Sequence, residues 1–317
     1  MSYPDTLFLR AIGIILILNS HLDRFYPIPY LGTGGALGNS IFFFLSGFGV
    51  FLSQKKNSRA FLEWFAGRLK RIYPSLWIVL LLVKMPLMII AGKLYASTII
   101  DFIGYFFNPP YWFLMMLLVY YIFSFRLLTA NYRKTLGVFV MLIPLYIGCY
   151  VTWVDLSRWS IEKSPFDLIH YLMIFIFGIF LANKSEKIVY SGSHNFIILL
   201  LFISVLYFHK YLMTKGLYFE YQIIQQLVMY PIVFYLLKIS RSSLITSQIM
   251  QNNYISPIFK FLGNHTLEIY MVHETIIYPV LKLGKTFPEN LTLFLVLTFG
   301  ISYIVNKLAV SIRKNLK

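Results

Sequence analysis

Two polar side chains lie in the first apolar stretch of the chain, Arg10 and His21. They are eleven positions apart, which in an α-helix is about 20° past three full turns and ~16 Å along the axis. They therefore share one helix face, and a charge in an apolar span is by default a functional candidate. His21 could act as a general base, because an imidazole has an unperturbed pKa of ~6.5. The alternative is that the two side chains only reach out to opposite membrane interfaces.

A second basic pair, Arg68 and Arg71, ends the most basic loop just before Pro74. If this stretch is helical, the two arginines lie on one face. Two guanidinium groups so placed can grip phosphate in a forked geometry. The alternative is ordinary positive charge on the cytoplasmic side, or contact with anionic lipid.

Three residues in other apolar runs are candidates for substrate contact or structural support. Ser46 precedes Gly47 in a Phe-rich run, where small residues favour close helix packing. Tyr111 and Trp112 open a later run and suit the outer interfacial aromatic belt. Lining a substrate entrance is the alternative role for this aromatic pair.

The late run Leu262–Glu274 contains two further candidates, Glu268 and His273. A carboxylate such as Glu268 inside an apolar run needs a partner. His273 and Glu274 lie nearer the outer side, and their spacing from Glu268 gives no metal chelate on a single helix face. No Cys/His cluster with metal spacing occurs in the sequence, so no metal is expected. Three more histidines lie near the ends of apolar runs and are expected at the membrane interfaces: His170, His194 and His209.

The elements that must position these residues are membrane helices. Of 317 residues, 58% are hydrophobic and only 13% are charged, whereas a soluble domain has about 25% charged residues. One span needs roughly 20 apolar residues. The sequence has ten such runs: 7–22, 36–53, 73–92, 111–128, 136–154, 166–183, 194–212, 222–237, 265–281 and 290–307. Irregular backbone facing lipid is too costly, and the runs are continuous where a β-barrel would alternate. The prediction is an all-α polytopic membrane protein with about ten transmembrane helices.

The net charge of +16 comes mostly from Lys and Arg residues in the loops between the apolar runs. With the N-terminus inside, roughly two-thirds of the Lys and Arg residues fall on the inner side, which predicts both termini in the cytoplasm. This bias explains most of the charge without a nucleic-acid partner. No composition shift marks a boundary, so residues 1–317 are expected to form a single transmembrane domain without an additional extracytoplasmic domain.

The order of these motifs resembles the membrane-bound acyltransferase-3 family, the O-acyltransferases that modify bacterial polysaccharides. The matching elements, in chain order, are Arg10 with His21, the run Phe42 to Phe48, Arg68 with Arg71 and Pro74, Tyr111 to Leu114, and Leu262-Gly263 through Tyr270 to His273. They extend over nearly the whole chain. Glu268 departs from the pattern, because many relatives have a small hydroxyl residue there.

The resemblance implies an acyltransferase that uses acyl-CoA, with acetyl-CoA as the expected donor. His21 is then the essential catalytic residue, and Arg10, Arg68 and Arg71 bind the donor. The resemblance also implies a multi-pass protein of the bacterial cytoplasmic (inner) membrane that acts in the cell envelope. Its acceptor would be a hydroxyl of a polysaccharide or lipid-linked glycan. The choice between direct O-acetylation and an acyl-histidine intermediate stays open, as do other short acyl groups, the acceptor's identity and the oligomeric state.

Two other classes of protein fit the composition. A transporter or flippase of a lipid-linked sugar or polysaccharide also has many spans with buried Arg and His. Such a protein favours broken helices at matching places in two halves, and no such symmetry is found in the sequence. A sensor or structural membrane protein is the third class.

Overall fold

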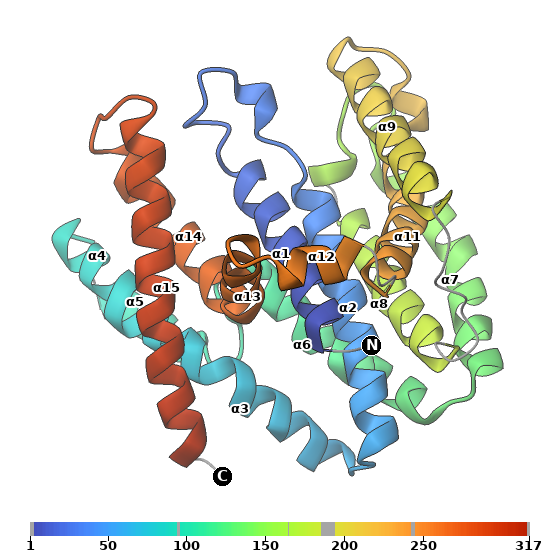
Figure 1. The fold of residues 1–317 in the computed structure, drawn as a ribbon, viewed down its shortest axis with the longest axis horizontal. Coiled ribbons are helices and arrows are strands. Elements are labelled where there is room, and N and C mark those ends of the chain that lie inside the picture. The colour runs from blue at the N-terminus through green and yellow to red at the C-terminus, as the bar shows by residue number, and fades with distance from the viewer. Residues whose placement is uncertain (1–2, 94–95, 164, 185–193, 242–244, 316–317) are drawn as a thin grey trace. The chain divides into compact units, whose positions relative to one another are not determined.

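A computed structural model describes residues 3–93, 96–163, 165–184, 194–241 and 245–315 of the chain (Figure 1). These residues form helices, and no strand occurs among them. Eight helical stretches are long and apolar enough to cross a membrane. They are Pro29–Lys56, Phe61–Ile90, Trp112–Thr129, Tyr132–Trp153, Phe166–Lys184, His194–Thr214, Phe219–Arg241 and Glu289–Asn315. The prediction of an all-α polytopic membrane protein is confirmed.

The two remaining predicted spans are helical but shorter. Residues 7–22 overlap α1 (Tyr3–Ser20), and residues 265–281 overlap α14 (Thr266–Leu281). α1 has 18 residues and includes Asp5 and Arg10, and α14 has 16 residues. The count of ten spans and the cytoplasmic location of both termini therefore stay predictions.

The helices fall into two compact units built from alternating segments of the chain. Unit 1 comprises Met1–Gly13, Ala36–Ser58 and Phe123–Lys260, and unit 2 comprises Ile14–Gly35, Arg59–Ile122 and Phe261–Lys317. The division runs through α1, so Arg10 belongs to unit 1 and His21 to unit 2.

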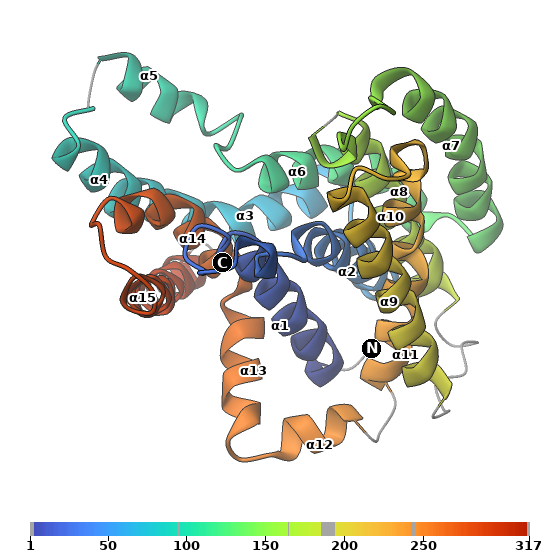
Figure 2. The ribbon, with the colours of Figure 1, turned by 90° about the horizontal axis from the view of Figure 1, so that it is seen from above.

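Unit 1 contains two helix pairs that pack side by side, α7 with α8 and α9 with α11 (Figure 2). Its helices are α2 (Gly35–Lys56, from Ala36 on), α7 (Tyr132–Trp153), α8 (Phe166–Asn183), α9 (His194–Thr214), α10 (Ile223–Leu227), α11 (Met229–Arg241), α12 (Ile245–Gln251) and most of α13 (Ile255–Asn264). In α7 and in α9, only 22% of the most apolar 18-residue segment is buried within the protein. Their apolar side chains mostly face outward, as lipid contact requires.

Two glycines let α2 and α8 approach closely within unit 1. A Cβ on Gly47 would lie 2.0 Å from the Phe175 carbonyl oxygen, and one on Gly178 would lie 2.3 Å from that of Phe44. Only residues without a Cβ fit this contact, which is how small residues bring membrane helices together. The close helix packing expected in this run is therefore made by Gly47. Ser46, which precedes it, is half-buried.

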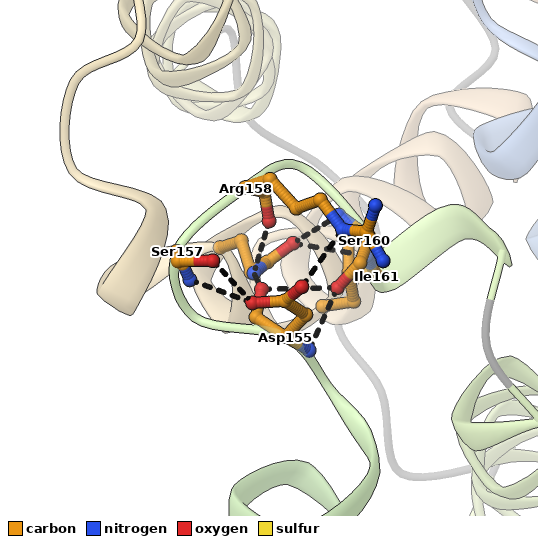
Figure 3. Close-up of polar contacts among 6 residues, drawn as sticks. Asp155, Ser157, Arg158, Ser160 and Ile161 are labelled. Carbon is orange, nitrogen blue, oxygen red and sulfur yellow. Dashed lines mark hydrogen bonds and ion pairs between the residues drawn. The ribbon is translucent and has the colours of Figure 1, made fainter.

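The loop between α7 and the short 3-10 helix η4 (Ile161–Lys163) is held by side chains (Figure 3). The amide and hydroxyl of Ser157 donate to the Asp155 carboxylate at 3.0 and 2.6 Å, and these bonds lower the pKa of that carboxyl. The Gln222 side chain accepts from the amides of Ser160 and Ile161. It also donates to the carbonyl oxygens of Asp155 and Arg158. One buried amide thus anchors the loop at four main-chain positions.

Two of the three histidines that were expected at the membrane interfaces are buried within the protein. His170 is only 1% exposed, lies 3.4 Å from the Ser40 hydroxyl and packs against the Tyr230 ring. His209 is 7% exposed. His194 is exposed at the start of α9. Position along an apolar run does not reveal which side of the helix a residue faces, and both buried histidines lie on faces covered by the rest of unit 1.

Unit 2 is built around three helices that pack against one another, α3 (Phe61–Val79), α14 and α15 (Glu289–Asn315) (Figures 1 and 2). α3 continues into α4 (Met85–Ile90) through a π-helical turn, Leu80–Lys84. The unit also holds the end of α1, α5 (Ala96–Gly104) and most of α6 (Trp112–Ser124). All the candidate residues except Arg10 and Ser46 lie in this unit.

Candidate active site

α14 presents three polar side chains on one face, Tyr270, His273 and Glu274. His273 and Glu274 follow Tyr270 by three and four positions, so each is a neighbour of Tyr270 on the helix surface. His273 is completely buried, and Tyr270 is 4% exposed. The Tyr270 ring lies 5.6 Å from the His273 ring, and its hydroxyl donates to the Glu274 carboxylate at 3.2 Å.

His21 lies in the turn directly after α1, where its amide donates to the Leu18 carbonyl oxygen at 3.0 Å. The chain that follows folds back over the helix end. The Asn19 side chain donates to the carbonyl oxygens of Leu31 and Thr33 at 2.8 and 2.9 Å and accepts from the Tyr26 hydroxyl. Asn19 therefore fixes the segment on which His21 lies.

A glycine allows this fold-back. A Cβ on Gly35 would lie only 2.4 Å from the Ser20 hydroxyl oxygen. The returning chain can therefore pass beside the residue that precedes His21 only because position 35 has no side chain.

The two histidines meet within unit 2. The His21 and His273 ring centroids are 5.0 Å apart, with the planes tilted by 56°. Glu274 joins them, and the nearest ligand-type atoms of the three residues all lie within 4.8 Å of one another. His21 is half-buried, so this group combines a solvent-reachable imidazole with a buried one.

The His273 ring has one satisfied and one unsatisfied nitrogen. Its Nδ1 lies 3.0 Å from the Ile269 carbonyl oxygen. Its Nε2 is buried and has no hydrogen-bond partner among the described residues. A buried polar atom without a partner is rare in proteins and calls for an explanation.

Glu274 faces a positive charge. Lys84, the last residue of the π-helical turn, is close enough for its charge to act on Glu274. The Lys84 ammonium also lies over the Tyr105 ring, 4.8 Å from its centroid. π-helical turns are frequent at functional sites, and this one ends in a lysine whose charge acts on the carboxylate of the site.

Tyr111 supports α14 from the start of α6. It is 3% exposed, and its hydroxyl lies 2.8 Å from that of Thr275. Because the Thr275 hydroxyl already donates to the Met271 carbonyl oxygen, Tyr111 is the donor. Tyr111 is thus covered by α14, whereas Trp112 is 42% exposed. The aromatic-belt expectation concerns depth in a membrane and stays a prediction for both residues.

Arg68 and Arg71 lie on α3, as their spacing predicts. The Arg68 guanidinium lies over the Trp64 ring, 5.3 Å from its centroid, and Trp64 packs edge-on against Tyr121. The charges of Arg71 and Arg59 both act on Arg68. Arg71 is exposed and Arg68 half-buried, so this stretch of α3 concentrates positive charge beside an aromatic platform.

Glu268 has partners, as a carboxylate at this depth requires. It is 2% exposed and accepts from the Ser75 hydroxyl at 2.6 Å. An Arg313 guanidinium nitrogen donates to the same hydroxyl at 2.6 Å and lies 3.3 Å from Glu268. These contacts join α14, α3 and α15, so they indicate structural support in place of substrate contact.

Three residues near the candidate site were not predicted from the sequence: Glu274, Lys84 and Arg313. The signal that could have revealed them is the presence of opposite charges in separate apolar runs, because a charge inside a membrane needs a partner. Residue spacing along a single helix gave no set of metal ligands. In the structure, His21 comes from a distant segment and lies beside His273 and Glu274. Two imidazoles and one carboxylate are ligand types that can hold a divalent metal.

Comparison with known proteins gives one match. A family model described as an acyltransferase domain, that of the acyltransferase-3 family, matches residues 5–307, essentially the whole chain. Searches of curated proteins and of solved structures found no match.

Proposed function

The chain belongs to the acyltransferase-3 family, and from this membership we propose that it moves an acetyl group from cytoplasmic acetyl-CoA to a sugar hydroxyl. The acceptor is a cell-surface polysaccharide or a lipid-linked glycan at the outer face of the bacterial cytoplasmic membrane. Acetyl is proposed because acetyl-CoA is the donor that the family resemblance leads us to expect. Membership supports the general activity, a membrane acyltransferase, and the donor and acceptor are the proposal.

One observation carries the proposed site: the half-buried His21 lies against the fully buried His273 and beside Glu274. A base must be reachable by substrate yet sheltered from bulk water, and His21 combines the two conditions. It sits in a segment that Asn19 holds in place, as a positioned base requires.

The proposed reaction has a simple proton balance. His21 takes the proton of the acceptor hydroxyl while the oxygen attacks the thioester carbonyl. The acyl–sulfur bond breaks as the acyl–oxygen bond forms, and the proton passes from His21 to the CoA sulfur. The products are an ester and free CoA thiol, with His21 restored.

Arg68 and Arg71 are proposed to bind the CoA phosphates from the cytoplasmic side, with Arg10 as a further contact for the donor. Guanidinium groups suit this task because they donate two parallel hydrogen bonds to phosphate oxygens. The concentration of charge around Arg68 supports the assignment.

The test uses the purified protein in lipid nanodiscs with acetyl-CoA, measuring release of CoA thiol. Mass spectrometry of surface glycans, with and without the gene, looks for the gain of an ester. His21→Ala should lower turnover by about 10²–10⁴-fold. The matched control is His194→Ala, an exposed histidine at the start of α9, which should retain wild-type turnover. A protein that neither consumes acetyl-CoA nor changes any glycan would contradict the proposal and favour the transporter or flippase considered above.

A further inference from the structure

We propose that His273 is a positioning residue that accepts a hydrogen bond from the ring of His21, and that Glu274 balances the charge His21 acquires during transfer. This inference rests on the proposed function, because it gives His21 its orientation as a base. It concerns the neighbours of His21 and does not change the donor or the acceptor.

The first step is the protonation of His273. Its Nδ1 lies 3.0 Å from the Ile269 carbonyl oxygen, and a carbonyl oxygen can only accept a hydrogen bond. Nδ1 therefore carries the proton. In a neutral ring the other nitrogen, Nε2, then has a lone pair and no hydrogen.

The second step is the partner of that lone pair. Nε2 is buried and has no hydrogen-bond partner among the residues that the structure describes. The neighbouring imidazole of His21 has a ring N–H to offer, and its centroid is 5.0 Å away. A small rotation of His21, or one bridging water, completes the bond. Leaving the acceptor unpaired costs about 1–3 kcal/mol, which favours this arrangement.

The third step is the consequence for His21. A neutral imidazole has one N–H and one lone pair, and the bond that one nitrogen makes decides what the other can do. If His21 donates to His273, its second nitrogen must present a lone pair. That is the state in which His21 can take a proton from a hydroxyl.

Glu274 acts at the stage when His21 becomes positively charged. Its carboxylate lies within 4.8 Å of both histidines, is oriented by the Tyr270 hydroxyl and faces the charge of Lys84. An oriented carboxylate stabilises the developing imidazolium, much as the acidic residue of a serine protease triad does.

A metal ion is the competing occupant of this group, and the geometry disfavours it. Zinc binds nitrogen and oxygen ligands at about 2.0–2.2 Å in a tetrahedron, so its ligand atoms lie ~3.5 Å apart. Here the separations extend up to 4.8 Å, and Glu274 already accepts from Tyr270.

The main experiment is independent of activity. Protein labelled with ¹⁵N-histidine has six histidines, whose nitrogen shifts report which ring atom carries the proton. We expect His273 to show protonated Nδ1 and His21 to show one fixed tautomer. In His273→Leu, the His21 signal should change to a mixture of tautomers. An unchanged His21 signal would overturn the inference even if the protein transfers acetyl groups.

Kinetics provide the second measurement. His273→Leu should lower kcat by about 10²-fold with an unchanged KM for acetyl-CoA. His273→Gln retains an acceptor oxygen and should restore most of that loss, which a purely structural role would not produce. Equal loss in both variants would refute the inference. If the wild-type protein has no turnover, the proposed function fails and the tautomer experiment still decides the hydrogen bond.

Metal analysis of the purified protein distinguishes a bound metal ion from the proposed hydrogen bond. We expect no stoichiometric metal and no effect of a chelator on turnover. One tightly bound zinc ion per chain, lost in both His273→Leu and Glu274→Gln, would replace the hydrogen-bond assignment with a metal site.

Discussion

Arg313, near the end of α15, places a guanidinium nitrogen 3.3 Å from the Glu268 carboxylate. The carboxylate is 2% exposed and the arginine side chain 27% exposed. The two residues come from different helices and meet over the Ser75 hydroxyl of a third helix. The contact therefore links the three helices that form the centre of unit 2.

Removing one partner of this pair should destabilise the protein without affecting the chemistry. Glu268→Ala leaves the Ser75 hydroxyl without its acceptor and the Arg313 charge without its counter-ion, and breaking a buried pair costs about 3 kcal/mol at the low end. Tm in detergent should fall by roughly 5–10 °C, while turnover per folded molecule stays near wild type. Glu289→Ala, which breaks the exposed pair with Lys285, should cost less than about 1 kcal/mol. A loss of turnover at unchanged Tm would instead assign Glu268 to the substrate.

Arg68 and Arg71 should affect binding of the nucleotide part of the donor. Arg68→Gln and Arg71→Gln should each raise KM for acetyl-CoA by about tenfold, the effect of losing one charged hydrogen bond. The value of kcat should stay the same. KM for S-acetyl-pantetheine, which lacks the phosphates, should not change. The control is Arg133→Gln, an exposed arginine over the Tyr132 ring. A similar rise for both donors would count against phosphate binding.

The two glycines between α2 and α8 should tolerate no side chain. Gly47→Ala places a Cβ 2.0 Å from the Phe175 carbonyl oxygen, which forces the helices apart at a cost of about 1–3 kcal/mol or more. Gly49→Ala in the same helix meets no atom within 4 Å. This control should stabilise the helix slightly, by ~0.5–1 kcal/mol. Thermal unfolding of the two variants should shift in opposite directions, and equal shifts would contradict the close contact.

The predicted topology can be tested with introduced cysteines. Cys149 is the only cysteine and is buried, so a Cys149→Ser protein serves as the background. Asn57→Cys and Thr286→Cys each change an exposed loop residue. The charge bias predicts that a membrane-impermeant maleimide labels position 286 in intact cells and position 57 only after permeabilisation. The reverse pattern would invert the topology.

Much of the fold could be predicted from the sequence because membrane insertion depends on local properties. A continuous apolar run must become a helix in lipid, and eight of the predicted runs coincide with long apolar helices. The runs at 7–22 and 265–281 were harder to define. Each contains charged or polar residues that lower its hydropathy, and the corresponding helices, α1 and α14, have 18 and 16 residues.

The candidate site could be predicted only in part. His21 and His273 were identified as separate residues, but spacing along the chain contains no information about a contact between distant segments. The sequence also did not reveal which of these side chains are buried. Tyr111 and His170 were both expected at an interface, and each is covered by helices from elsewhere in the chain. Lys84 and Glu274 are opposite charges in apolar runs, and the structure brings them close enough for each charge to act on the other.

The loop that Gln222 anchors has a consequence for handling the protein. The anchor bonds from Gln222 reach only main-chain atoms of the loop, and the Asp155 and Ser157 side chains add bonds within it. Leu156 is exposed there and has no part in these bonds, so it can be exchanged for a fluorophore attachment point. Such a label would report on unit 1 from a rigid position, well separated along the chain from every residue assigned to the chemistry.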